Sequence, residues 1–323
     1  MTRHYQVITV GETTIDAFMT LAHANTAAEL NKETGDICFH HGEKIDVDRY
    51  DFTIGGNATN VAVGLNRLGI KTALCSETGD DEFSIKIRNC LANEQIERTL
   101  VTQTNGPSNF SVIINFKNDR TIFVQDVTRE HDFHFDEVSA DYIYLTSLGN
   151  EWQEPYKQVL EFAKEQKARV AFNPGSRQLH EGRDFVRSTL KQTHLLFLNK
   201  EEAELVLFDK ETQEAEKDYV HDLLLKLRKY GPQVVVITCG RKGSYALDEK
   251  GKLHTFGTHE GEVVEKTGAG DGYTAGFLAA YIHGLPVPKA MEWGSWNATS
   301  VVGKIGAEAG LLTKREMEEK IGK

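Results

Sequence analysis

The sequence predicts an α/β fold, in which a mainly parallel sheet is covered by helices on both faces and carries a small β lid over one edge. Three observations support this prediction. Beyond Asp141, short apolar segments alternate with helical stretches. An apolar, β-branched segment lies near the start of the chain, and two segments of alternating polarity near residue 120 are typical of a hairpin. We expect residues 1–323 to form one domain, with the lid drawn from about residues 12–53 and 108–128.

The N-terminal part contains two segments that are typical of buried strands, Tyr5–Val10 and Lys71–Ser76. Between them, Thr13–Asp51 has no regular pattern, and we expect short exposed strands and loops there. Apolar residues recur at helical spacing over Asn57–Leu68, and Gly69 stands where a C-terminal cap belongs. A strand, an irregular segment, a helix and a second strand are therefore predicted in this order.

The remaining elements follow from shorter patterns. Ser111–Phe116 and Thr121–Val127 alternate in polarity and are joined by the polar residues 117–120, which predicts the hairpin. Thr313 followed by Glu316 predicts a capping box that begins a final helix. Four apolar strands and two of the helices between them are predicted at Tyr142–Leu145, Arg169–Phe172, Leu195–Leu198, Gln233–Thr238, Trp152–Lys167 and Tyr219–Tyr230.

Composition restricts the classes of function. A chain of 323 residues with 40% hydrophobic residues can bury a large core without metals or disulfides. The formal net charge of −11 argues against nucleic acid or an anionic membrane as partner. No apolar stretch is long enough to span a membrane, and the N-terminus has no signal-peptide core. The four cysteines form no CxxC pair and are expected to be reduced thiols, so we predict a cytoplasmic protein.

The strongest motif is the glycine-rich segment 267–272, followed by a helical stretch to His283. The backbone N–H groups of Gly268, Ala269 and Gly270 can converge on an anion there, and the helix dipole adds to the attraction. A negatively charged aspartate inside such an anion hole is unusual unless it accepts a proton from the substrate. Asp271 is therefore the candidate general base. A glycine-rich turn with an aspartate in the first helical turn remains an open alternative.

A second motif, Gly55-Gly56-Asn57-Ala58-Thr59-Asn60, begins the first helix. Two glycines let a ligand approach the backbone closely, and Asn57 and Asn60 lie three positions apart on one helical face. A tight strand-to-helix turn with asparagine as its cap explains the same residues. No GxxxxGK[ST] segment is present, and no GxGxxG segment follows Val10, which argues against P-loop kinases and dinucleotide-dependent dehydrogenases.

Together and in this order, the two motifs resemble the signature regions of the ribokinase-like (PfkB) carbohydrate kinases, Gly-Gly-x-x-x-Asn and Gly-Ala-Gly-Asp. The resemblance extends over nearly the whole chain. It implies a Rossmann-type three-layer sandwich with a β lid, ATP as phosphate donor with Mg²⁺, and a sugar or nucleoside as acceptor. It also implies a role for Glu202, which would organise Mg²⁺ through water.

The resemblance assigns further residues to each ligand. Those implied for the acceptor are Asp16, Gly55, Gly56, Asn57 and Asn60; those implied for ATP and Mg²⁺ are Asn199, Glu202, Thr238, Gly240, Gly243 and Asn297. In the resulting mechanism, Asp16 and Asn60 hold acceptor hydroxyls while Asp271 takes the proton of the attacking one.

This sequence departs from the family pattern at two places. Glu265-Lys266-Thr267 stands where relatives often have Asp-Thr-Thr, a segment that helps to bind K⁺, so K⁺ activation is left open. Asn57 stands where ribokinases carry lysine, so ribose is not assigned as the acceptor. An adenosine-type nucleoside is left open beside a sugar. A non-catalytic ligand-binding regulator and a homodimer formed through the lid are also left open. The turn at 173–176 is explained equally well by local structure and by a substrate contact.

Overall fold

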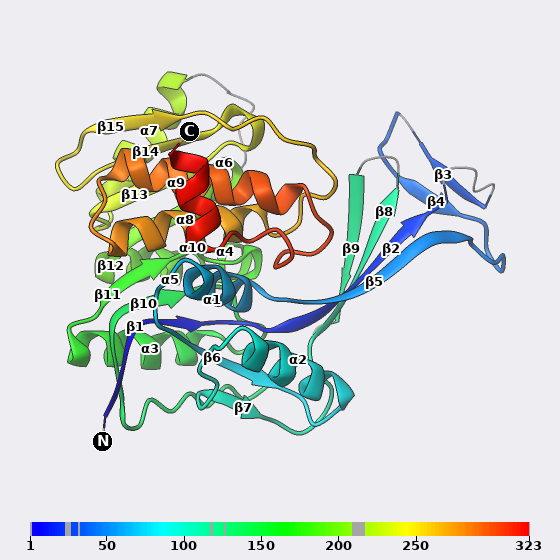
Figure 1. The fold of residues 1–323 in the computed structure, drawn as a ribbon, viewed down its shortest axis with the longest axis horizontal. Helices are drawn as coiled ribbons and strands as arrows, with labels where there is room; N and C mark the ends of the chain where they lie inside the picture. The colour runs from blue at the N-terminus through cyan, green and yellow to red at the C-terminus, as the bar shows by residue number, and fades with distance from the viewer. Residues whose placement is uncertain are drawn as a thin grey trace.

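The computed structural model describes residues 2–22, 27–31, 33–116, 119–125, 127–208 and 217–322. In this part of the chain a nine-stranded sheet lies between two layers of helices, and a four-stranded sheet projects from one end (Figure 1). This is the predicted three-layer α/β arrangement.

The large sheet has the order β15-β14-β13-β12-β11-β10-β1-β6-β7. Neighbours from β7 to β13 pair in parallel, whereas β14 and β15 are antiparallel additions. The central strands are rich in valine, isoleucine and leucine because helices bury both of their faces. The strands are β1 (Arg3–Val10), β6 (Thr72–Thr78), β7 (Val101–Gln103), β10 (Val138–Leu145), β11 (Arg169–Phe172), β12 (Thr193–Asn199), β13 (Val234–Thr238), β14 (Ser244–Leu247) and β15 (Leu253–Phe256).

The two helical layers bury separate cores against this sheet. One layer contains α3 (Gln153–Gln166), α4 (Ser176–Glu181), α5 (Arg183–Thr189), α6 (Lys200–Leu207) and α7 (Lys217–Arg228). The other contains α1 (Asn57–Arg67), α8 (Ala269–Ile282), α9 (Val287–Val302) and α10 (Lys314–Ile321), and α2 (Glu82–Asn93) packs beside α1. Two short 3₁₀ turns, Leu190–Gln192 and Gly240–Lys242, complete the helical elements of the described residues.

The predicted helix ends are confirmed where local chemistry decides them. Gly69 adopts a left-handed φ of 85° just beyond α1, a conformation that glycine takes without strain. Thr313 and Glu316 form the predicted capping box at the start of α10. Within the described residues, no helix is both long and apolar enough to cross a membrane.

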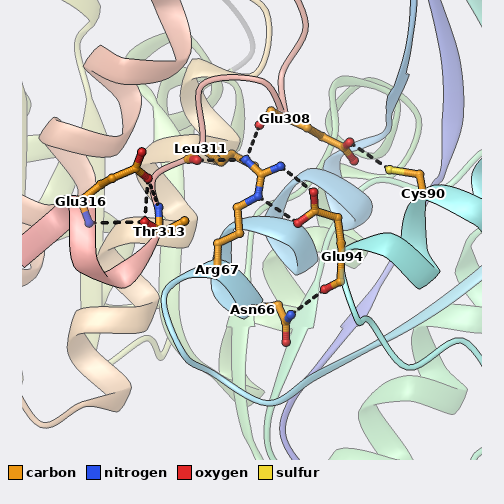
Figure 2. A network of polar contacts seen from close by, with 8 residues as sticks. All are labelled: Asn66, Arg67, Cys90, Glu94, Glu308, Leu311, Thr313 and Glu316. Carbon is orange, nitrogen blue, oxygen red and sulfur yellow. Dashed lines mark hydrogen bonds and ion pairs between the residues drawn. The ribbon is translucent and has the colours of Figure 1, made fainter.

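A polar network holds the C-terminal end of α1 in place (Figure 2). Arg67 pairs with Glu94 at the end of α2, with an Nη2–Oε1 distance of 2.6 Å. It also donates to the backbone oxygens of Glu308 and Leu311 at 2.8 and 2.9 Å. Because residues 303–312 pack against the start of α8, where Ala307 faces Gly268, this network holds α1 and α8 in one arrangement.

The small sheet has the order β5-β2-β8-β9, with β2 (Thr14–Leu21) parallel to β8 (Phe110–Phe116) and antiparallel to β5 (Val47–Gly55). A two-stranded ribbon, β3 (Ala28–Leu30) and β4 (Ile37–Phe39), lies between β2 and β5 in the sequence. The prediction of short exposed strands over Thr13–Asp51 is wrong for β2. This strand is eight residues long and mostly buried, because it is an inner strand of the sheet.

The predicted hairpin is confirmed, with slightly different bounds. β8 pairs in antiparallel fashion with β9 (Asp119–Val124), so Asp119 and Arg120 belong to the second strand and not to the turn. The predicted turn residues Lys117 and Asn118 lie outside the described residues.

Candidate active site

A cavity of about 460 Å³ lies where the carboxyl ends of β12 and β13 meet the small sheet and the N-termini of α1 and α8. Ligands of open α/β sheets bind at this edge. The cavity brings together residues from both sequence motifs and from the small sheet. The predicted site residues that line it are Asp16, Gly56, Asn57, Asn60, Asn199, Glu202, Thr238, Gly268, Ala269, Gly270 and Asp271.

Asp271 lies buried in the first turn of α8. The pKa of its carboxyl group is raised to about 7, mainly by burial and also by the nearby carboxylates of Glu202 and Asp16, while a hydrogen bond from Asn60 lowers it. The Asn60 side chain donates this bond from Nδ2 to Asp271 Oδ2 at 2.8 Å. A carboxylate with a pKa near neutral pH is well suited to accept a proton and release it again.

Asn60 therefore has a role that the sequence did not show. It was predicted to hold the acceptor, whereas its amide nitrogen holds Asp271. Its Oδ1 atom is buried in the cavity wall without a hydrogen-bond partner among the described residues. Asn60 thus orients the candidate base, and its side chain is part of the cavity lining.

The turn before α8 requires glycine at Gly268, which has a φ of 79°. A Cβ atom there would lie 2.3 Å from the Cβ of Ala307. The Ala269 N–H donates to Lys266 O at 3.3 Å, so this amide is already engaged. The next two amides, of Gly270 and Asp271, lie in the first turn, where an α-helix has no acceptor for its N–H groups. They are the better candidates for an anion hole, and the positive end of the helix dipole strengthens them.

The paired glycines before α1 are explained by Asp16. This aspartate lies buried on β2, and burial raises the pKa of its carboxyl group to about 6. A Cβ at Gly55 would lie 2.1 Å from Asp16 Oδ2, and a Cβ at Gly56, where φ is 94°, would lie 2.4 Å from Glu12 O. The glycines were predicted to let a ligand approach the backbone. In the structure Gly55 makes room for a carboxylate that lines the cavity, and Gly56 makes room for the backbone of Glu12.

The Asn199-x-x-Glu202 motif is a capping box at the start of α6. Asn199 accepts from Glu202 N at 2.7 Å, and Glu202 Oε2 accepts from Asn199 N at 2.9 Å. Burial raises the pKa of the Glu202 carboxyl group to about 7. Asn173, in the turn after β11, lines the same cavity and donates to Phe197 O at 2.8 Å. The turn therefore has a local structural role and contributes to the cavity wall.

Four predicted residues do not line the cavity. Gly55 lies behind Asp16, as described above, and Gly240 and Gly243 shape the turn after β13 with φ values of 52° and 88°. Asn297, which was predicted to lie beside the adenine, is not among the residues that line the cavity. Its side chain is fully buried, donates to Gly272 O at 2.8 Å and accepts from Leu312 N at 2.9 Å, so both ends of the amide bind backbone.

Some residues of the cavity were not predicted at all. Arg120 on β9 and Lys266 before α8 supply positive charge, while Glu12 and Asn109 add polar groups beside Asp16. Arg120 Nε lies 3.6 Å from Oε1 of Glu265, which is buried. The alternation of β9 could have indicated Arg120, because it shares a face with Ile122 and Val124, which also line the cavity.

Comparison with known proteins identifies the family. The model of the pfkB family carbohydrate kinases matches residues 16–314. The chain belongs to the pfkB family of carbohydrate kinases. A pfkB kinase transfers a phosphoryl group to a hydroxyl of a sugar-like small molecule, which confirms the prediction of a kinase. Kinases of this family use ATP.

Three individual relatives illustrate the similarity. The chain is 25% identical to an ATP-dependent 6-phosphofructokinase of Thermoanaerobacterium thermosaccharolyticum over 310 residues, which cover 90% of this chain and 86% of the relative. It is 25% identical to a 5-dehydro-2-deoxygluconokinase of Geobacillus thermodenitrificans over 291 residues, 82% of this chain and 83% of the relative. The crystal structure of the Methanocaldococcus jannaschii nucleoside kinase superposes with a TM-score of 0.75 at 23% identity and covers 98% of each chain, which confirms the predicted ribokinase-like fold.

Proposed function

We propose that this pfkB kinase transfers the γ-phosphoryl group of ATP to a hydroxyl of a sugar-like acceptor, with Asp271 as general base. One observation carries the proposal: a buried carboxylate with a pKa near 7 lies at the N-terminus of α8, inside the cavity, and is held there by Asn60. A residue in the first helical turn that served only the helix would not need a partner from another element.

The cavity has two halves that meet at α8. Side chains of the small sheet, including Asp16, surround the half assigned to the acceptor. Asn199, Glu202 and Thr238, at the ends of β12 and β13, surround the half assigned to ATP. In the transfer, Asp271 takes the proton of the attacking hydroxyl as its oxygen bonds to phosphorus and the bond to the ADP oxygen breaks. The N–H groups of Gly270 and Asp271 stabilise negative charge on the transferred group.

The residues present fit a magnesium ion at Glu202. Carboxylate oxygens are preferred ligands of Mg²⁺, which keeps several of its waters, and the buried Glu202 carboxyl group faces the ATP half. When bound, Mg²⁺ neutralises charge on the triphosphate. A K⁺ site at Glu265 fits less well, because its carboxylate accepts from the N–H and hydroxyl of Thr267 and faces the Arg120 guanidinium. We therefore propose only a weak response to K⁺.

Three further proposals concern the protein as a whole. The small sheet is proposed to act as a lid over the acceptor, since three of its four strands, β2, β8 and β9, contribute residues to the cavity wall. Its outer face exposes Tyr50, Phe52 and Phe123, at 69%, 46% and 53%, and we propose a homodimer through this face. A cytoplasmic location is proposed because the four cysteines are free thiols.

Phosphoryl transfer across a panel of acceptors tests the function. Purified protein with ATP and Mg²⁺ is assayed on sugars, sugar acids, phosphosugars and nucleosides, and the products are identified by mass spectrometry. We expect one chemical class to be phosphorylated with a clear preference. If ATP binds but no member of the panel is phosphorylated, the assignment of the cavity to sugar-like acceptors is wrong.

A further inference from the structure

The small sheet carries an arginine on the face that lines the acceptor half of the cavity. Strand register shows this directly: Asp16 is paired with Ser111, which is paired with Val124, and Ile113 is paired with Ile122. Side chains alternate along a strand, so Arg120 points to the same side as Ile122 and Val124. All of these residues line the cavity.

The contact of Arg120 with Glu265 fixes where the guanidinium lies. Nε is 3.6 Å from Glu265 Oε1, and the exposed fractions of the two side chains are 28% and 2%. Glu265 is one of the charges that act on the Asp16 carboxyl group. The guanidinium therefore belongs to the small-sheet side of the cavity, which is the side assigned to the acceptor.

This position has a chemical consequence. A neutral sugar offers hydroxyl groups, and the carboxylates and amides around it, Asp16, Glu12 and Asn109, are enough to bind them. A guanidinium adds a planar set of N–H donors with a fixed positive charge, which matches the oxygens of a carboxylate or a phosphate. Beyond its ion pair with Glu265, a guanidinium that lines the cavity can therefore also contact a negative group on the acceptor.

We propose that Arg120 is a specificity-determining residue, which selects acceptors that carry a carboxylate or a phosphate monoester in addition to the hydroxyl that is phosphorylated. The proposal rests on the assignment of this half of the cavity to the acceptor. The partial exposure of Arg120 leaves it accessible from the cavity.

Binding of matched ligand pairs tests this proposal independently of turnover. Isothermal titration compares the binding of D-gluconate with that of D-glucitol, and the binding of D-fructose 6-phosphate with that of D-fructose. Within each pair, only one ligand carries a negative group. The first pair tests recognition of a carboxylate, and the second tests recognition of a phosphate. We expect at least one anion to bind the wild-type protein about 10- to 100-fold more tightly than its neutral partner, the range of a charge-assisted hydrogen bond. Arg120→Ala should reduce this ratio to about 3-fold or less, and Arg120→Lys should restore part of it.

The matched control is Arg49→Ala, which removes an exposed arginine from β5 of the same sheet, where it pairs with Asp51. This variant should keep the wild-type ratio, and melting curves of all variants show whether the fold is intact. Equal binding within both wild-type pairs would overturn the proposal, as would an Arg120→Ala variant that loses neutral and anionic ligands equally. A change confined to ATP affinity would place Arg120 on the phosphate donor and would also overturn it. Preferential binding of an anion without phosphoryl transfer would instead count against the proposed function alone.

Discussion

Replacement of Asp271 by asparagine separates a catalytic role from a structural one. The substitution keeps the size of the side chain, and its amide oxygen can still accept from Asn60 Nδ2. It removes the ability to take a proton from the acceptor hydroxyl. General-base catalysis typically contributes roughly 10²- to 10⁴-fold, so kcat should fall by about that factor. The KM for ATP should hold or decrease, because a negative charge beside the phosphates is gone.

The same variant should be more stable than the wild type at neutral pH. Burial raises the pKa of Asp271 from 3.8 to about 7 in the folded protein. The folded protein therefore holds a proton that the unfolded chain has already lost between these values, and its stability falls as pH rises from about 4 to 7. At about 1.4 kcal/mol per unit of pKa, the ionised carboxylate costs on the order of 4 kcal/mol above pH 7. Asp271→Asn removes this term.

Two measurements on one protein check the reasoning. Turnover is measured with the best acceptor of the panel, and unfolding by denaturant is followed at pH 5 and pH 8. We expect a large loss of kcat together with a gain in unfolding free energy that is greater at pH 8 than at pH 5. Near-normal turnover in the folded variant would refute Asp271 as the base. A loss of stability at pH 8 would refute the account of its burial.

The other predictions concern the parts around Asp271. Asp16→Ala should raise the acceptor KM by about 10-fold or more with little change in the KM for ATP. The reason is that loss of a charged hydrogen-bond partner affects only the ligand that it contacts. Equal changes in both constants would show that the two halves of the cavity are misassigned. Asn60→Ala removes the hydrogen-bond donor that lowers the pKa of Asp271, so the acidic limb of the kcat–pH profile should move to higher pH. An unchanged acidic limb would contradict the effect of Asn60 on the pKa of Asp271. Exchange of K⁺ for tetramethylammonium should change the rate less than about 2-fold, whereas a large activation by K⁺ would show that backbone oxygens complete a cation site. Hydrogen exchange in β2 and β8 should slow when acceptor binds, and no change in either strand would argue against a closing lid.

How much the sequence could show depended on whether the signal was local. The capping box at Thr313, the glycine beyond α1 and the glycine-rich start of α8 involve residues close in the chain, and these were predicted correctly. β2 was missed because four consecutive residues, 15–18, are buried, so its two faces do not alternate in polarity. The burial of Asn297 could not be predicted, because the sequence of α9 does not show that the amide binds the backbone of Gly272 and Leu312.

The arrangement of the carboxylates explains why the candidate site could be recognised but not completed from sequence. Asp16, Glu202 and Asp271 come from three separate regions of the chain, and burial raises the pKa of each. Three such groups in one cavity destabilise the empty protein at neutral pH. Under the proposed function, ligands would meet them: hydroxyl protons at Asp16 and Asp271, and a cation at Glu202. Arg120 lines the same cavity from β9, a strand where an isolated arginine is typical of a solvated surface. Only the register of β9 against β8 shows that it points into the cavity.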